Sequence, residues 1–408
     1  MDGTVLFVGG GRHQKRAIRR ARELGLRVVA VDRNSDAPGL ADADVAEVLD
    51  FQDVPAVVEL GRQERVDGVL TVSADRAVPI VAAVAEQLGL PGIGSSTAHL
   101  MTHKVAMRRR FGDAGVTQPR FAAARDVREG RAALDHVGLP AVLKPADSGG
   151  QRGVFRLESW DDLYAHLHAA LAESPTGEAI VEQFVEGLEL NGLAVARGGD
   201  VTLLTLSDRL RPPGIGFGVG WIHVYPSTLF GDALEQAEEV AVESVHALGL
   251  RDGIAFPQLI VGADGVRIVE CAARIPGGQM ADLAWHAVGV DLVEIALRQA
   301  LGLDVPNELV EPRFSRPLAI RFLTSSPGPL PAGRVVSVGP LDKVLAFPGV
   351  VQADVFLQEG ETIRPVRLDG DRRGYVIAVG ETNVEALERA EAAATLVSVE
   401  VEPAEVPA

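Results

Sequence analysis

The sequence predicts an α/β fold divided into three domains. At 408 residues the chain exceeds the length that one hydrophobic core normally serves. Its hydrophobic fraction of 47% and charged fraction of 23% are typical of globular proteins. Short apolar segments alternate with helical patterns from the amino terminus onward. We therefore expect an open parallel sheet in residues 1–95, a mixed α/β domain in residues 96–315 and an α+β lobe in residues 316–408.

The first domain has the strand, turn, helix and strand pattern of a parallel βαβ unit. The expected elements, in order, are a strand at Thr4–Val8, a turn at Gly9–Gly11, a basic helix at Arg12–Leu24, a strand at Arg27–Val31, a strand at Val69–Val72 and a helix at Ala77–Leu88. The amino terminus is thus expected to form a strand, because it lacks the basic segment and long apolar core of a signal peptide.

The second domain is expected to begin with one helix over Ala98–Ala114, ended by Gly115–Pro119. Its expected strands are Ala141–Lys144, Ala179–Glu182, Leu190–Ala196, Thr202–Leu206, Ile254–Val261 and Val266–Cys271. Those of the third lobe are Ala319–Leu323, Tyr375–Val379 and Leu396–Val401. Three helix starts carry a capping residue and a glutamate three positions later: Asp232 with Glu235, Asp291 with Glu294 and Thr382 with Glu385.

Charge and cysteine content narrow the function classes. The formal charge of -17 argues against a nucleic-acid binder, because a phosphate backbone requires a concentrated basic face. No segment has the roughly 20 apolar residues of a membrane span. The single cysteine, Cys271, cannot form an internal disulfide. We expect a cytoplasmic enzyme with neither nucleic-acid nor membrane partners, and a homodimer is the commonest state for such enzymes.

The glycine turn of the first domain allows a rival interpretation, a dinucleotide site. Asp32 ends the next strand, where a ribose-binding acid would lie. The third glycine of a G-x-G-x-x-G pattern would fall at position 14, however, and Gln14 occupies it. A tight turn that at most touches a substrate carboxylate is the simpler interpretation.

A lysine and a small, glycine-rich loop suggest a phosphate site in the second domain. Lys144 ends an apolar strand, and the loop at 147–153 contains Ser148, Gly149 and Gly150. Such residues let backbone amides approach a polyphosphate while the lysine supplies a point charge. Lys104, upstream, offers a second cation. A surface hairpin and a solvated helix face are the alternatives.

Two downstream segments carry further polar groups. Ile180–Glu189 is an apolar strand running into a short polar segment, suited to an adenine edge and a ribose hydroxyl, or an ordinary strand with an acidic turn. Glu270 and Arg274 share one face of a strand by its two-residue repeat. The carboxylate suits Mg²⁺ and the guanidinium suits a phosphoryl group or an oxyanion, although a plain ion pair gives the same pattern.

Taken in order, these features resemble the ATP-grasp superfamily over essentially the whole chain. Glu270-Cys271-Ala272-Ala273-Arg274 is similar to the E-x-A-A-R pattern of bacterial L-amino acid ligases, and Arg373–Ala378 is similar to part of their carboxy-terminal lobe. The resemblance implies a two-lobed ATP-grasp domain at 96–315, preceded by a pre-ATP-grasp domain, with ATP and Mg²⁺ as cofactors. It also implies a ligase that phosphorylates a small-molecule carboxylate and lets an amine displace phosphate, giving an amide and ADP.

The same resemblance assigns roles to individual residues. Glu270 would bridge Mg²⁺ ions, and Arg274 would stabilise the acyl-phosphate step and the tetrahedral intermediate. The residues implied to bind ATP are Lys104, Lys144, Ser148, Gly149, Gly150, Glu182, Gln183, Phe184, Val185 and Glu189. The chain departs from the family where a second metal-binding acid is expected shortly before Glu270, because Gln258 stands there. Its amide oxygen can ligate Mg²⁺, but with less charge.

The segment Ser207–His223 is rich in glycine and proline, and we expect a mobile loop over the substrates or an ordinary solvent loop. Candidate substrate-binding residues are Arg209, Arg211, His223, Tyr225 and, on a strand of the third lobe, Arg321.

Two other functions remain open besides a carboxylate–amine ligase. Biotin-type carboxylation is disfavoured because no methionine flanks a lysine in the Met-Lys-Met hairpin of a biotin carrier. A weakened ATP-binding regulatory protein is suggested by Gln258 alone, whereas both lysines, Glu270 and Arg274 are in place.

Overall fold

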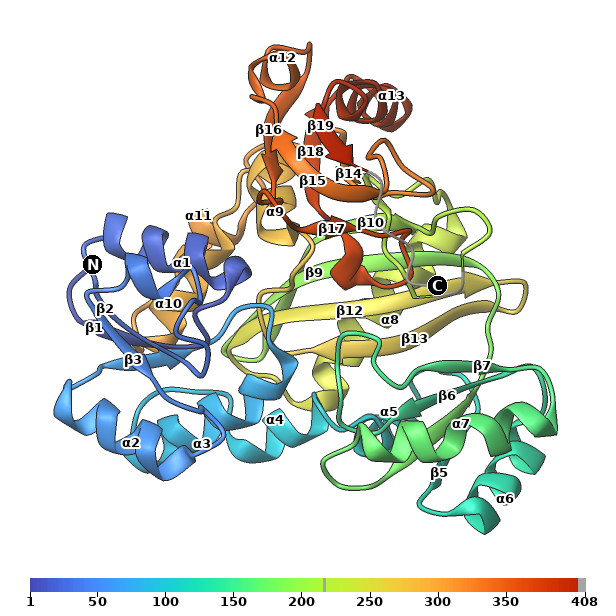
Figure 1. Ribbon diagram of the computed structural model, residues 1–408. Coiled ribbons are helices and arrows are strands. Elements are labelled where there is room, and N and C mark those ends of the chain that lie inside the picture. The colour runs from blue at the N-terminus through green and yellow to red at the C-terminus, as the bar shows by residue number, and fades with distance from the viewer. Residues whose placement is uncertain (216–217, 403–408) are drawn as a thin grey trace.

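The computed structural model describes residues 1–215 and 218–402, so positions 216–217 of the predicted loop and 403–408 of the third lobe lie outside the described part. The described strands form four sheets, and in Figure 1 the first domain, a small lobe and a third lobe surround a large central sheet. No helix in the described ranges combines the length and apolar character that a membrane span requires.

The first domain is the open parallel sheet that the sequence predicts, with strand order β3-β2-β1-β4. Its elements are β1 Thr4–Val8, α1 Arg12–Glu23, β2 Arg27–Asp32, β3 Val45–Val48, α2 Val54–Gln63, β4 Gly68–Leu70 and α3 Val78–Leu88. Successive side chains of β1 enter different cores, since Phe7 packs with Ile18 of α1 and Leu6 packs with Val57 of α2. Helices therefore cover both faces of the sheet.

The predicted single helix over Ala98–Ala114 is wrong, because two helices occupy this region. They are α4 Ser95–Leu100 and α5 Lys104–Ala114. His103 is the N-cap of α5, and its Nδ1 accepts a hydrogen bond from the Ala106 backbone N–H at 3.3 Å. The break makes Lys104 the first helical residue and turns it toward the small lobe.

The small lobe is a four-stranded antiparallel sheet of order β5-β8-β6-β7 with two helices. Its elements are β5 Phe121–Ala124, α6 Val127–Val137, β6 Ala141–Pro145, β7 Phe155–Leu157, α7 Trp160–Ala172 and β8 Ala179–Gln183. A separate core that includes Leu134, Leu143 and Leu163 lies between the helices and the sheet. The lobe is thus a packing unit of its own.

The central sheet has eight strands in the order β13-β12-β9-β10-β11-β14-β18-β16. They are β9 Leu188–Arg197, β10 Asp200–Leu210, β11 Ile222–Tyr225, β12 Gly253–Gly262, β13 Gly265–Ala272, β14 Leu318–Phe322, β16 Val350–Val355 and β18 Gly374–Val379. Helix α8, Asp232–Leu248, shares a buried core with β12 and β13. Because β11 pairs with β14, the sheet runs without interruption from the second predicted domain into the third.

Ser207–His223 was expected to be a loop throughout, and this is wrong at both ends. Ser207–Leu210 continues β10, and Ile222 and His223 begin β11. Asp208 is buried, and the Ser227 and Thr228 hydroxyls each donate to its carboxylate at 2.6 Å. These partners compensate for the burial of a charge that sequence patterns count as polar.

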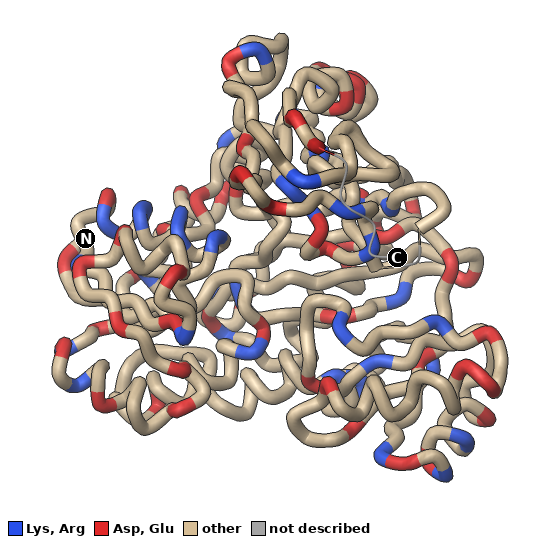
Figure 2. The backbone as a smooth tube through the Cα atoms, in the orientation of Figure 1, with Lys and Arg blue, Asp and Glu red and all other residues tan. Residues whose placement is uncertain are grey.

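Three helices after β13 return to the first domain: α9 Met280–Val288, α10 Leu292–Ala300 and α11 Asn307–Val310. Leu283 and Leu292 belong to the same buried core as Phe7 of β1. Figure 2 shows basic positions along α1, and two of them pair with α9 and the cap of α10, Arg16 with Asp282 and Arg20 Nε with Asp291 at 2.8 Å.

The third lobe adds a three-stranded sheet of order β17-β15-β19. Its elements are β15 Gly333–Val338, α12 Asp342–Leu345, β17 Thr362–Ile363, α13 Asn383–Ala394 and β19 Val399–Glu402. The predicted caps at Asp291 and Thr382 are confirmed by side-chain hydrogen bonds to backbone amides. The predicted cap at Asp232 is wrong, because Gly231 takes the N-cap position and Asp232 lies inside the first turn of α8.

Candidate active site

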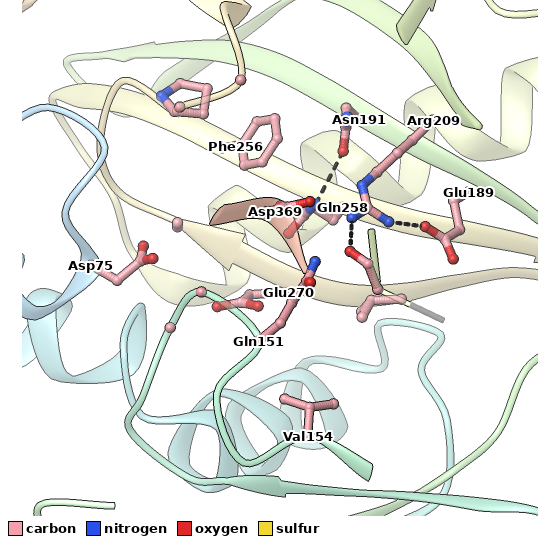
Figure 3. Close-up of a pocket in the computed structure, with 18 of the residues that line it drawn as sticks. Asp75, Gln151, Val154, Glu189, Asn191, Arg209, Phe256, Gln258, Glu270 and Asp369 are labelled. Carbon is pink, nitrogen blue, oxygen red and sulfur yellow. Dashed lines mark hydrogen bonds and ion pairs between the residues drawn. The ribbon is translucent and has the colours of Figure 1, made fainter. Parts of the chain in front are cut away.

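A cavity of about 580 Å³ lies where the small lobe, the central sheet, the first domain and the third lobe meet (Figure 3). Every predicted site residue except Arg321 and Tyr225 lines it. Figure 3 shows Asp75 and Glu270 facing the same space, with Gln151 of the glycine-rich loop beside them. Segments far apart in the sequence therefore converge on one site.

Two lysines mark the end of the cavity near the glycine-rich loop. Lys104 Nζ donates to the Ser148 carbonyl at 2.8 Å and lies 3.7 Å from Glu270 Oε1. Lys144, at the end of β6, lies 2.6 Å from Glu182 Oε2. Both lysines are buried, so their ammonium groups are held by protein groups, Lys104 by the loop and Lys144 by Glu182, rather than solvated. This arrangement favours a polyphosphate over a solvated surface hairpin.

Glu182 is held by a second cation that sequence reasoning missed. Arg108 Nε donates to Glu182 Oε1 at 2.9 Å, and its Nη1 donates to the Ile268 carbonyl at 2.6 Å. Burial alone would raise the pKa of Glu182, but the charges of Arg108 and then Lys144 lower it to about 2. Burial also lowers the pKa of Lys144, opposed by Glu182. The spacing of Arg108 one turn after Lys104 was the available signal.

An apolar slot lies between the small lobe and the central sheet, suited to a flat base. It is lined by Val142, Val154, Phe184, Val185, Leu259, Ile260 and Val269. At its edge, Arg211 Nε lies 3.2 Å from Glu189 Oε1, and Arg209 pairs with the other oxygen of the same carboxylate. The structure thus brings Arg209 and Arg211 to Glu189, where they balance its charge.

Glu270 and Gln258 face each other across β12 and β13. Gln258 Nε2 donates to Asn191 Oδ1 at 3.1 Å (Figure 3). The amide nitrogen of Asn191 lies on the opposite side, 3.2 Å from His223 Nδ1. Burial, and then the charges of Arg372 and Arg209, lower the pKa of His223 well below its usual value. His223 is therefore neutral at physiological pH, and its Nδ1 accepts from Asn191.

The described residues contain no group of three or more His, Cys, Asp or Glu side chains placed to hold a metal ion. This donor set nevertheless fits Mg²⁺, which is usually held by one or two carboxylates together with substrate phosphates. Glu270 supplies a carboxylate that is 25% exposed toward the cavity. The Gln258 amide nitrogen is engaged by Asn191, which leaves its oxygen as the atom able to face a cation.

Arg274 is oriented by an aspartate of the first domain that sequence reasoning also missed. Its Nε and Nη2 both lie 2.7 Å from Asp75 Oδ1, whereas its buried Nη1 has no partner within residues 1–215 and 218–402. The backbone around Asp75 is fixed because Ser73 N donates to the Ile275 carbonyl at 2.9 Å. A guanidinium held in this way keeps one nitrogen available for a developing negative charge.

The third lobe supplies a cation that the sequence did not single out. The Arg372 guanidinium lies 4.1 Å from the centroid of the Phe322 ring, and Asp369 pairs with it. Burial lowers the pKa of Arg372 to about 10, and its Nε has no partner among the described residues. Arg12, at the start of α1, lies 4.3 Å over Phe356 and lines the same region. Arg372 directly precedes the recognised Arg373–Ala378 segment, which was the available signal.

The structure corrects the predicted placement of Arg321 and Tyr225. Arg321 is buried with its guanidinium 4.0 Å from the Trp221 ring, and burial lowers its pKa to about 10. Tyr225 is also buried, with its hydroxyl 3.0 Å from that of Ser315. Neither lines the cavity, because both lie on the side of their strands that packs against other protein groups.

The glycine turn of the first domain is filled by protein atoms. The Gln14 side chain lies over it, within 3.2 Å of the position that a Cβ on Gly9 would take. The Gly10 N–H donates to Asp32 Oδ2 at 2.9 Å. A pyrophosphate would need both the space and the amide, so the tight-turn interpretation is favoured over a dinucleotide site.

Three family models match this chain in succession. Residues 18–92 match the ATP-grasp N-terminal domain, residues 103–308 match the carbamoyl-phosphate synthase L chain ATP-binding domain, and residues 328–402 match the L-amino acid ligase C-terminal domain 2. Together they cover most of the chain between residues 18 and 402.

Some relatives are similar to almost the whole chain. A formate-dependent phosphoribosylglycinamide formyltransferase of Ignicoccus hospitalis is 30% identical over 411 residues, covering 97% of this chain and 96% of that protein. The same enzyme from a Synechococcus species is 29% identical and covers 97% of each chain.

The fold is shared with an L-amino acid ligase from Bacillus licheniformis, at a TM-score of 0.84 and 21% identity over 98% of this chain and 99% of that one. Phosphoribosylglycinamide synthetase from Anaerococcus prevotii gives a TM-score of 0.78 at 19% identity, over 98% and 100%. With the matched domains and the convergent lysines, carboxylate and arginine, this chain belongs to the ATP-grasp family of ATP- and Mg²⁺-dependent carboxylate–amine ligases.

Proposed function

We propose that this enzyme joins a small organic acid to an amine through an acyl phosphate. A carboxylate oxygen attacks the γ-phosphorus of ATP and ADP leaves. The amine nitrogen then attacks the acyl carbon, phosphate leaves, and the nitrogen loses a proton to water, giving an amide. The observation that carries this proposal is the meeting of Lys104, Lys144, Glu270 and Arg274 in one cavity. These groups can hold a polyphosphate at one end and an oxyanion at the other.

The ATP half of the cavity divides into three parts. Lys104, Lys144 and the amides of Ser148, Gly149 and Gly150 bind the phosphates. The apolar slot holds adenine, with the Gln183 to Val185 backbone along its edge. Glu189, held by its two arginines, accepts from ribose hydroxyls. Glu182 contributes indirectly, since its contacts with Lys144 and Arg108 fix the lysine that meets the phosphates.

Glu270 and the Gln258 amide oxygen are the proposed protein ligands of Mg²⁺, which when bound would neutralise charge on the transferring phosphate. Arg274, oriented by Asp75, stabilises the oxyanion of the tetrahedral intermediate through its free Nη1. Glu270 and Gln258 would thus act at the phosphates, and Arg274 at the acyl carbon.

The remaining part of the cavity accommodates the acid. Its lining combines cations, Arg12 and Arg372, with the aromatic rings of Phe322 and Phe356. His13 adds a group whose pKa is lowered by burial and then by Arg372, Arg12 and Arg274, which indicates a strongly positive surrounding. An acid with a second anionic or polar group and an apolar body fits this lining. An amino acid or a short peptide-like acid meets that description.

The test is ADP release by the purified full-length protein with Mg-ATP and pools of amino acids, supplied singly and in pairs. We expect release only when an acid and an amine are both present, with loss of release in Glu270→Gln. Mass spectrometry of the product mixture should show the corresponding amide.

Two outcomes would contradict the proposal. Release that requires bicarbonate but no amine would indicate carboxylation instead. Tight ATP binding without release from any pool would indicate a regulatory ATP site weakened at Gln258.

A further inference from the structure

A second cavity, of about 440 Å³, lies behind the strand end that carries Arg274. Ala272 and Arg274 line the active site, whereas Ala273 and Ile275 line the second cavity, as the alternation of an extended segment predicts. Arg274 lines both cavities. The second cavity is bounded by β4 and α3 of the first domain, the start of β12 and the end of α10. Figure 1 shows α10 beside the first sheet.

The interior of the second cavity is apolar. Its walls include Leu70, Val78, Ile254, Ile275 and Val305, all buried. These side chains come from four separate parts of the sequence, and they leave a space large enough for a small organic molecule instead of closing on one another.

One polar atom in this wall lacks a partner. Gln299 of α10 donates from Nε2 to the Ala196 carbonyl at 2.7 Å, which fixes the direction of the amide. Its Oε1 is buried and accepts no hydrogen bond from the described residues. An unpaired buried acceptor is costly, so a ligand that places an N–H there would be favoured.

The mouth of the cavity carries negative charge. Asp252 and Asp304 line it and are exposed, and neither forms an ion pair within the described ranges. Arg197 also lines the mouth, with Nη1 on the Val305 carbonyl at 2.9 Å, and the other cation of the lining, Arg274, is paired with Asp75. The two carboxylates at the mouth therefore outnumber Arg197. Ala196, which Gln299 contacts, pairs with Gly253 next to Asp252. The free acceptor and the Asp252 carboxylate therefore lie at the same end.

We propose that the second cavity binds a small apolar amine that acts as an effector. Its hydrocarbon body fills the apolar interior, one N–H meets Gln299 Oε1, and its positive charge is balanced by Asp252 and Asp304. This site is additional to the proposed ligase reaction, and its occupancy is measured without that reaction.

The site is coupled to Arg274 through two backbone connections. Ile275 forms a parallel bridge with Val72, and Ser73 N donates to the Ile275 carbonyl. Asp75, two residues later, holds the Arg274 guanidinium. A molecule against Ile275 and Leu70 thus touches both the segment that carries Arg274 and the strand that leads to Asp75. We therefore expect it to change the rate of ADP release.

Calorimetric titration of the full-length protein with 2-phenylethylamine tests the site, with phenylacetate as a matched probe of opposite charge. We expect saturable binding of the amine alone, and binding about tenfold weaker after Asp252→Asn combined with Asp304→Asn. Ala296 of α10 lines the cavity, and Ala296→Phe, which fills the interior, should abolish binding. Leu303 also lines it and is exposed, so Leu303→Trp blocks the mouth without altering the core and should abolish binding too. The second variant keeps the test decisive if the first does not fold.

Three results would overturn the proposal. They are absence of amine binding to the wild-type protein, equal binding of phenylacetate, and binding that survives both blocking variants. The amine should also shift ADP release in the wild-type protein but not in Leu303→Trp, and an equal shift in both would place its action elsewhere.

Discussion

Gln258, which we propose as a neutral ligand of Mg²⁺, has its amide oriented by Asn191. Replacing it by Glu should lower the Mg²⁺ concentration that gives half-maximal ADP release, by roughly tenfold, because a carboxylate binds a hard cation more strongly than an amide oxygen. Gln258→Leu should raise that concentration. A magnesium titration of both variants checks this, and identical titrations would remove Gln258 from the metal site.

Asp75 holds two nitrogens of Arg274 from a different domain. Asp75→Asn removes the charge that orients the guanidinium, so we expect kcat for ADP release to fall by about 10- to 100-fold with little change in the KM for ATP. Asp53→Asn is the matched control, since Asp53 caps α2 and asparagine caps helices equally well. A rise in KM with unchanged kcat would assign Asp75 to ATP binding instead.

Glu182 gives the stability of the chain a specific pH dependence. Its pKa falls from 4.5 in the unfolded chain to about 2, so the stability it contributes is fully present above about pH 4.5 and is lost as the pH falls toward 2. The difference in unfolding free energy between wild type and Glu182→Gln should be constant at neutral pH and shrink below pH 4.5. Denaturant titrations over this range test it, and a constant difference would contradict it.

The glycine-rich loop docks on the first domain. Arg76 donates to the Ser148 hydroxyl at 3.1 Å, and a Cβ on Gly149 would lie 2.6 Å from Asp75 Oδ2. Gly149→Ala should therefore prevent the loop from closing and weaken apparent ATP affinity by about tenfold or more. Gly112→Ala in α5 is the control, because its Cβ would meet the nearest side chain at 3.4 Å. Unchanged ATP affinity in Gly149→Ala would show that the loop closes elsewhere.

At the scale of elements, local patterns predicted most strands and the parallel sheet but misplaced some boundaries. The break at His103 is made by a local cap, because the His103 side chain accepts from the Ala106 backbone, whereas the extension of β10 to Leu210 depends on pairing with the distant strands β9 and β11. Site residues in recognisable order, such as Lys144 and Glu270, could be predicted. Arg108 and Arg372 were not singled out, although each lies close in sequence to a predicted residue, because only the tertiary fold brings Arg108 to Glu182 and Arg372 to the cavity.

At the scale of the molecule, the first domain shares its core with helices from the middle of the sequence. Phe7 and Ile18 pack in one cluster with Leu283 and Leu292. A fragment of residues 1–95 should therefore expose apolar surface and unfold without cooperativity, whereas the full chain unfolds cooperatively. Circular dichroism during thermal denaturation checks this, and a cooperative transition of the isolated fragment would contradict it.

The uninterrupted eight-stranded sheet has an evolutionary consequence. β14 and β18 complete the same sheet as β9 to β13. Genetic recombination at the boundary near residue 316 would therefore break the β11–β14 pairing and leave two strand edges with unpaired backbone groups. New acid specificities in this lineage are therefore expected to arise by point substitution at positions such as Phe356 and Arg372. The small lobe, with its own sheet and core, is the part that descendants could exchange whole.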